Sequence, residues 1–214
     1  MKFYFIGNSH VNIFRGSHRL FDQDLLELFR TEHLGPTIAY NFYEHHYPKV
    51  LEYLERTQID KENDYICIVV GEVDCRWHLP KQSEVQNRPI NDLVEEAINR
   101  FFRCYLDLKE RGYKVITWGG HPSTTSGHDD DLNKPVYGDC VTRNKISLYW
   151  NDYLKKISDE NNVKFLSVMK YLIDDDGLTK MDFFLDYCHL NTWKILPFVN
   201  IELNKLFDKE FDLK

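Results

Sequence analysis

The sequence predicts one α/β domain over residues 1–214, a three-layer α/β/α sandwich with about five parallel strands. Two observations predict it. Short apolar runs alternate with longer amphipathic segments along the chain, and this alternation is typical of a parallel sheet covered by helices on both faces. The strongest run, residues 64–70, is apolar almost throughout, as expected of a strand buried on both sides. No repeat or linker divides the chain.

The expected strands are short runs rich in aromatic and β-branched residues, most of them followed by glycine or a polar turn. They are Phe3–Ile6, Ile38–Tyr40, Asp64–Val70, Lys114–Trp118 and Val163–Val168.

The expected helices lie between and after these strands. A short helix is expected within Val11–Arg30, after a loop at Arg15–His18, and longer ones over Tyr47–Arg56, Ile90–Arg111, Cys140–Asn162 and Trp193–Phe207. Pro48 suits a first helical turn, Asn91 is the expected cap of the third of these helices, and Gly112 ends it. Residues 123–138 are expected to form a long surface loop, and residues 174–177 a turn.

Composition narrows the class of protein. The formal charge of −7 disfavours a nucleic-acid partner. No apolar run approaches the ~18 residues of a membrane span, and the N-terminal run is too short for a signal peptide. The five cysteines are scattered and odd in number, which favours reduced thiols. A cytoplasmic protein without a membrane partner is therefore expected.

Polar clusters are expected at one edge of the sheet. Right-handed crossovers place the carboxyl ends of parallel strands on one side, where ligands bind in open α/β sheets. Ser9 follows the first strand through a Gly-Asn turn, the run Gly71–Arg76 follows the third strand, and His121 follows the fourth. A hydroxyl on such a turn is a candidate nucleophile. The alternative is an ordinary serine cap of a helix.

A second candidate lies near the C-terminus. Asp186 stands three residues before His189, between a turn and the last helix. At this spacing the carboxylate can orient the imidazole, and the imidazole can take a proton from a hydroxyl at the same edge. The alternative is a capping aspartate with a histidine in an ordinary hydrogen bond.

Together these segments resemble the SGNH (GDSL-like) hydrolase family, from residue 3 to the last helix. Phe5–His10 is similar to the first conserved block of that family, and Asp186–His189 is similar to the fifth. The resemblance implies a flavodoxin-like fold, with Ser9 as nucleophile, His189 as base and Asp186 as the acid that orients it. The two blocks lie at opposite ends of a chain of suitable length and strand order.

The sequence also departs from the family pattern. Asn8 stands where the family usually has aspartate, and Val73 occupies the third-block position of an asparagine that donates to the oxyanion. Gly35 is similar to the second-block glycine, whose backbone N–H helps to form the oxyanion hole. Loss of one oxyanion donor typically lowers the rate by about 10²–10³. Arg76 is the first candidate to replace the asparagine, and Asn8 is the second.

Two of these side chains have structural alternatives. Arg76 can stabilise an oxyanion or grip an anionic substrate group, or it can form a salt bridge to Glu72 or Asp74. His121 can contact substrate, although a histidine at this edge is more often a structural hydrogen-bonding group.

A metal site is not expected. A four-ligand zinc set could be written from Cys75, His78, Cys188 and His189. It is not favoured, because the adjacent residues Cys188 and His189 would both have to turn toward one ion, and His189 is the candidate base. No phosphate-binding glycine loop is present, and the resemblance implies no organic cofactor.

The expected function is hydrolysis of an ester-linked acyl group, with acetyl on a carbohydrate as the preferred substrate class. The substrate is a small-molecule or carbohydrate ester, and the oligomeric state is left open. An O-acyltransferase would use the same residues. A glycan-binding module on a decayed enzyme fold is an alternative of another class, because the third-block asparagine is missing.

Overall fold

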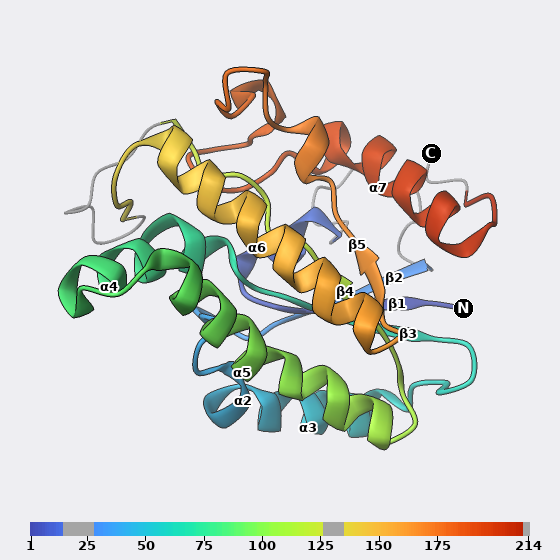
Figure 1. The fold of residues 1–214 in the computed structure, drawn as a ribbon. Coiled ribbons are helices and arrows are strands. Elements are labelled where there is room, and N and C mark those ends of the chain that lie inside the picture. The colour runs from blue at the N-terminus through green and yellow to red at the C-terminus, as the bar shows by residue number, and fades with distance from the viewer. Residues whose placement is uncertain (15–27, 126–134, 212–214) are drawn as a thin grey trace.

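The computed structural model describes residues 1–14, 28–125 and 135–211. Its sheet has five parallel strands in the order β2-β1-β3-β4-β5 (Figure 1). The strands are β1 (Phe3–Gly7), β2 (Phe29–His33), β3 (Tyr65–Val69), β4 (Lys114–Trp118) and β5 (Lys164–Leu166). The three-layer architecture with about five strands is confirmed.

The α-helices of the described residues are α2 (Phe42–His45), α3 (Tyr47–Thr57), α4 (Leu79–Gln86), α5 (Ile90–Glu110), α6 (Cys140–Glu160) and α7 (Thr192–Phe207). Short 3₁₀ helices are η1 (Ser9–Ile13), η3 (Met169–Tyr171) and η4 (Met181–Phe183), and η2 (Asp74–His78) is a π-helical turn. The long helices lie within a few residues of their expected bounds.

Alternation along β1 divides the core between two faces of the sheet. Tyr4 and Ile6 belong to a buried cluster with apolar residues of α3, α5 and α6. Phe3 and Phe5 belong to the opposite cluster, which η1 and α7 cover. Figure 1 shows α7 apart from α3, α5 and α6, on the other side of the strands. Both faces of β1 are thus removed from water, which explains its continuous apolar sequence.

The predicted second strand was wrong. Ile38–Tyr40 forms no strand, whereas Phe29–His33 pairs with β1 in parallel. Phe29 belongs there because its ring packs edge-on against the rings of Phe3 and Phe5. Residues 29 and 30, at the end of the expected helix within Val11–Arg30, therefore belong to β2. Residues 15–27, which include most of that expected helix and the loop before it, lie outside the described residues.

Other differences are local. Pro89, and not Asn91, precedes the first residue of α5, and no side chain caps this helix. The helical segment Asp74–Gln86, made of η2 and α4, was not predicted. All five cysteines are free and buried. Among the described helices, none is both long and apolar enough to cross a membrane.

The end of β1 needs a glycine. Gly7 pairs with Val69 of β3, and a Cβ atom built on Gly7 would lie 2.1 Å from the carbonyl oxygen of Val69. A side chain here would push β1 and β3 apart at the point where the chain turns toward Ser9.

We expect Gly7→Ala to lower the free energy of unfolding by about 1–3 kcal/mol or more, because the backbone of β3 cannot yield as a side chain can. Gly120→Ala is the matched control, since its Cβ would meet its nearest neighbour, in Trp150, at 3.5 Å, an ordinary contact. Urea unfolding of both variants measures the effect. Equal stabilities of the two variants would contradict the steric argument.

Candidate active site

Ser9 lies at the point where the strand order reverses. The order β2-β1-β3-β4-β5 changes direction between β1 and β3, and such a switch point opens a crevice at the carboxyl edge of the sheet. Asn8 makes the turn: its N–H donates to the carbonyl of Val69 at 3.3 Å, and its Oδ1 accepts from the N–H of His10 at 3.1 Å. Ser9 is then the first residue of η1 and is half-buried.

Ser9, His189 and Asp186 form a continuous chain of hydrogen bonds. Nε2 of His189 lies 2.8 Å from Oγ of Ser9, and Nδ1 of His189 lies 2.8 Å from Oδ2 of Asp186. With an ionised carboxylate, Nδ1 carries the proton donated to Asp186, so that the lone pair on Nε2 accepts from the serine hydroxyl. This arrangement can increase the nucleophilicity of Ser9.

The loop that carries Asp186 is held by its own backbone. Phe184 and Leu190 pair as an antiparallel bridge, and the N–H of Leu185 donates to the carbonyl of His189 at 2.7 Å. Oδ1 of Asp186 accepts from the N–H groups of Cys188 and His189, both at 2.9 Å. The carboxylate is therefore oriented before it meets the imidazole ring.

A cavity of about 450 Å³ opens beside these residues. Ser9 and His189 line it together with Asn8, His10, His33, Pro36, Thr37, Ile38, Asn41, His46, Val73, Arg76, Pro135 and Cys188. The candidate nucleophile and its base thus face a space in which a small acyl group can bind.

Only some of the residues expected at the oxyanion site line the cavity. Gly35 follows β2 with φ of 85°, between the lining residues His33 and Pro36, but it does not itself line the cavity. Val73 lines it with an aliphatic side chain. Asn8 lines it too, but its amide holds the turn, because Nδ2 also donates to the carbonyl of Thr37 at 3.4 Å.

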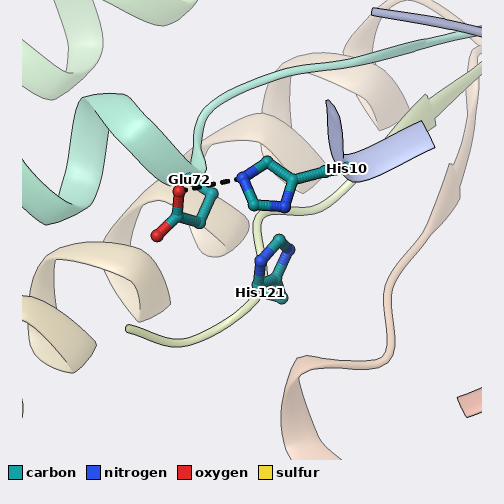
Figure 2. A group of neighbouring side chains, drawn as sticks. All are labelled: His10, Glu72 and His121. Atoms are coloured by element: carbon teal, nitrogen blue, oxygen red, sulfur yellow. Dashed lines mark hydrogen bonds and ion pairs between the residues drawn. The ribbon is translucent and has the colours of Figure 1, made fainter. Parts of the chain in front are cut away.

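Arg76 lines the cavity, and it forms the salt bridge to Glu72 that the structural alternative expected, so its part in binding an oxyanion stays a prediction. Its Nε donates to Oε1 of Glu72 at 2.7 Å, and Nη1 donates to the carbonyl of Pro135. Oε2 of Glu72 lies 2.9 Å from Nε2 of His10 (Figure 2). One carboxylate thus connects the arginine to the turn that carries Ser9.

Glu72 is ionised in this environment. Burial alone would raise its pKa, but the Arg76 guanidinium and the His10 ring outweigh burial and hold the pKa well below its usual range. All three side chains are buried. A buried ion pair of this kind contributes little to the net free energy of unfolding. Removal of one partner is destabilising, because it leaves the other charge buried without a partner.

His121 does not line the cavity, in contrast to the expected contact with substrate. It is buried, and its ring lies beside that of His10 (Figure 2), with 4.4 Å between the ring centroids. Its Nε2 lies 3.2 Å from the carbonyl of Cys188. Burial lowers the pKa of His121 to about 3, so the ring is neutral at pH 7. It contacts the loop of His189 from behind.

Two groups of described side chains have metal-ligand chemistry: His10, Glu72 and His121, and Asp186, Cys188 and His189. In the first group, both oxygens of Glu72 already accept hydrogen bonds. In the second, His189 joins Asp186 to Ser9. Neither group contains Cys75 or His78, so the four-ligand zinc set written from the sequence is not assembled.

The sequence reasoning missed the part that His10 and Glu72 play. His10 lies in the motif Phe5–His10 and Glu72 in the run Gly71–Arg76, where the sequence indicated Glu72 only as a partner of Arg76. The signal available in the sequence was the position of His10 directly after Ser9, at the same edge as Glu72.

No family model matches the chain, and the search of curated proteins found no match. Solved structures do match over nearly the whole chain. A candidate acylhydrolase from Bacteroides fragilis is 13% identical, with a TM-score of 0.66, over 97% of this chain and 86% of that one. A GDSL-like lipase from Bacteroides thetaiotaomicron is 12% identical, with a TM-score of 0.63, over 95% and 87%. A catalytic mutant of an acetylxylan esterase from Geobacillus stearothermophilus is 14% identical, with a TM-score of 0.57, over 98% and 94%. The chain shares their fold.

Asp74 is a second buried carboxyl beside the cavity wall. Its two oxygens accept the N–H of Ala39 at 3.1 and 2.9 Å, which fixes the segment 37–41 against η2. Burial raises the pKa of Asp74 to about 7, although these backbone N–H groups act in the opposite direction. The protonated carboxyl therefore contributes stability below its ordinary pKa of 3.8, and this contribution is lost as the pH rises through about 7.

We expect the free energy of unfolding of the wild type, relative to Asp74→Asn, to fall by on the order of 4 kcal/mol between about pH 4 and pH 8, because each pKa unit corresponds to about 1.4 kcal/mol. Urea unfolding of both proteins at the two pH values measures it. His121 is present in both proteins, so its contribution to the pH dependence cancels in the difference between them. That contribution has the opposite sign, because the pKa of His121 is lowered. A difference that does not vary with pH would show that Asp74 does not titrate in this range.

Proposed function

We propose that the protein is a serine esterase of the SGNH type, which hydrolyses an ester-linked acyl group. The observation that carries the proposal is the hydrogen-bonded chain from Ser9 through His189 to Asp186, with 2.8 Å at each step. The chain ends in a hydroxyl that lines a cavity at the switch point of the sheet. The shared fold with a GDSL-like lipase and acetylxylan esterases supports it.

The first half of the reaction forms an acyl-enzyme. Oγ of Ser9 attacks the ester carbonyl carbon as Nε2 of His189 takes the hydroxyl proton, and Asp186 stabilises the imidazolium that results. The tetrahedral intermediate then collapses. The bond to the alcohol oxygen breaks, and His189 gives its proton to the departing alkoxide, so that the alcohol leaves neutral.

The second half frees the enzyme. A water molecule in the place of the alcohol gives a proton to His189 and attacks the acyl carbon. Collapse of this second intermediate breaks the bond to Ser9, and His189 returns the proton to Oγ. The products are a carboxylic acid and the original serine, and the steps use only side chains and water.

The oxyanion needs donors in place of the missing asparagine. Ser9 supplies one, because the first N–H of a helix has no acceptor within that helix. Arg76 lines the same cavity, and its guanidinium is the second donor in this proposal, with the N–H of Gly35, in the turn after β2, as the third. Glu72 orients the Arg76 fork at Nε, and the guanidinium has further N–H groups that can donate to an oxyanion.

Acetyl on a carbohydrate is the proposed substrate class. The neighbours in fold include an acetylxylan esterase and an acetyl-xylooligosaccharide esterase. An O-acyltransferase would share every step up to the acyl-enzyme and differ only in the acceptor. Measurement of products with water alone and with added sugar acceptors separates the two.

We expect a fluorophosphonate probe to label the protein at Ser9, as located by peptide mass spectrometry. Labelling and hydrolysis of p-nitrophenyl acetate should both disappear in Ser9→Ala and fall by several orders of magnitude in His189→Ala, since the serine hydroxyl is unreactive without its base. His45→Ala, which changes an exposed histidine that does not line the cavity, should keep both activities. A wild type that is folded but neither labelled nor active would instead favour the glycan-binding module.

We expect Arg76→Lys to lower kcat by about 10²-fold with a smaller change in KM, because the planar fork contributes mainly when negative charge develops on the carbonyl oxygen. Arg56→Lys, an exposed arginine in a surface ion pair, is the control. Steady-state kinetics are compared with thermal melting, which should show that Arg76→Lys is folded. An unchanged kcat in a folded variant would remove Arg76 from the proposed oxyanion site.

A further inference from the structure

A second cavity, of about 260 Å³, adjoins the one at Ser9. Ile38 and Asn41 line both cavities, so the two spaces meet at these residues. The second cavity lies between the segment 38–41 and helix α4. Its remaining lining residues are Tyr40, His78, Leu79, Gln82, Gln86, Arg88 and Leu93. The chemistry proposed above does not use this space.

The polar side chains around the second cavity are linked to one another. Nε2 of Gln86 donates to Oε1 of Gln82 at 2.9 Å, and Nη1 of Arg88 donates to Oε1 of Gln86 at 3.2 Å. Arg88 and Tyr40 are then joined through Glu96, whose carboxylate accepts from Nη2 of Arg88 at 2.8 Å and from the Tyr40 hydroxyl at 2.9 Å. The two bonds of Gln86 lie at the surface and the two bonds of Glu96 are partly buried, so the rim of the cavity is polar.

The rest of the wall is apolar or aromatic. Leu79 and Leu93 are buried beneath the cavity. The ring of Tyr40 lies 6.1 Å from that of His78, and the backbone of Tyr40 is held by Nε of Arg100 at 2.8 Å. Burial lowers the pKa of His78, so its ring is uncharged at neutral pH.

This combination matches one class of ligand. Arg88 is neutralised by Glu96, so the cavity has no spare positive charge for an anion. A hydrocarbon chain would offer no partner to the amide N–H groups of Gln82 and Gln86 that these bonds do not use. A sugar has hydroxyl groups in fixed directions and also apolar C–H faces, and it can use both the amide groups and the aromatic rings.

We propose that the second cavity binds the sugar part of a carbohydrate ester while its acyl group occupies the cavity at Ser9. The ester bond would then cross the boundary formed by Ile38 and Asn41. This inference rests on the proposed esterase function and adds to it the site that recognises the alcohol. Helix α4, through Gln82 and Gln86, becomes a determinant of specificity.

The double variant Gln82→Ala/Gln86→Ala tests this assignment. Acetate release from xylose tetraacetate, glucose pentaacetate and acetylated xylo-oligosaccharides is compared with hydrolysis of p-nitrophenyl acetate, whose alcohol is not a sugar. We expect kcat/KM for at least one sugar ester to fall about tenfold, mainly through KM, while p-nitrophenyl acetate is unaffected, because the lost hydrogen bonds hold only the sugar. Glu84→Ala, on the same helix but lining a different cavity, should change neither substrate.

The outcomes separate the two proposals. The sugar-site proposal is wrong, and the esterase proposal stands, if the wild type hydrolyses p-nitrophenyl acetate but no sugar ester. The same holds if the double variant lowers kcat/KM equally for all substrates or for none of them. If the wild type hydrolyses no substrate and a fluorophosphonate does not label Ser9, the esterase itself is wrong and the sugar site loses its basis.

Discussion

The hydrogen bond between Ser9 and His189 joins residues that are 180 positions apart, and the site depends on how firmly the two ends of the chain are held together. The apolar cluster on one face of the sheet does most of this, because Phe3 and Phe5 of β1 pack in the same cluster as Ile195 and Val199 of α7. The hydroxyl of Thr192 also donates to the carbonyl of Asn12 at 3.2 Å. Burial of the aromatic residues of β1 thus contributes directly to the geometry of the candidate site.

A second constraint is electrostatic. The buried carboxylate of Glu72 is contacted by a histidine from the nucleophile turn and by an arginine from the cavity wall. Burial of such a cluster costs desolvation free energy, and the cluster stabilises the fold less than apolar residues of similar volume would. Its presence beside Ser9 is better explained by positioning: it holds a guanidinium in the cavity wall and connects it to the turn after β1. In this way η1 and η2, which follow β1 and β3, act as one unit.

The fold was predictable where the sequence pattern is local. The apolar runs of β1, β3 and β4 and the amphipathic patterns of α5 and α6 appear in the structure close to their expected bounds. The edge strand β2 was not predictable, because the FRTEH sequence has one buried residue and its pairing depends on contact of Phe29 with the β1 aromatics. The apolar segment 38–40 was mistaken for a strand because the backbone N–H of Ala39 bonds to the side chain of Asp74 in η2, 35 residues away, and not to a neighbouring strand.

By itself, the sequence determined the alternation of strands and helices, and with it a parallel sheet whose polar strand ends share one edge. It also contained the three residues of the hydrogen-bonded chain, since Gly7-Asn8 is turn chemistry and the spacing of Asp186 and His189 suits an oriented imidazole. Only the tertiary structure decided which polar residues face the cavity. It left Arg76 in the wall, placed His121 behind His189, and opened a second cavity beside α4. The physical reason is that turn and strand preferences act between residues that are neighbours in the chain. Exposure of a side chain to a cavity depends instead on how helices and strands that are far apart in the sequence pack against one another.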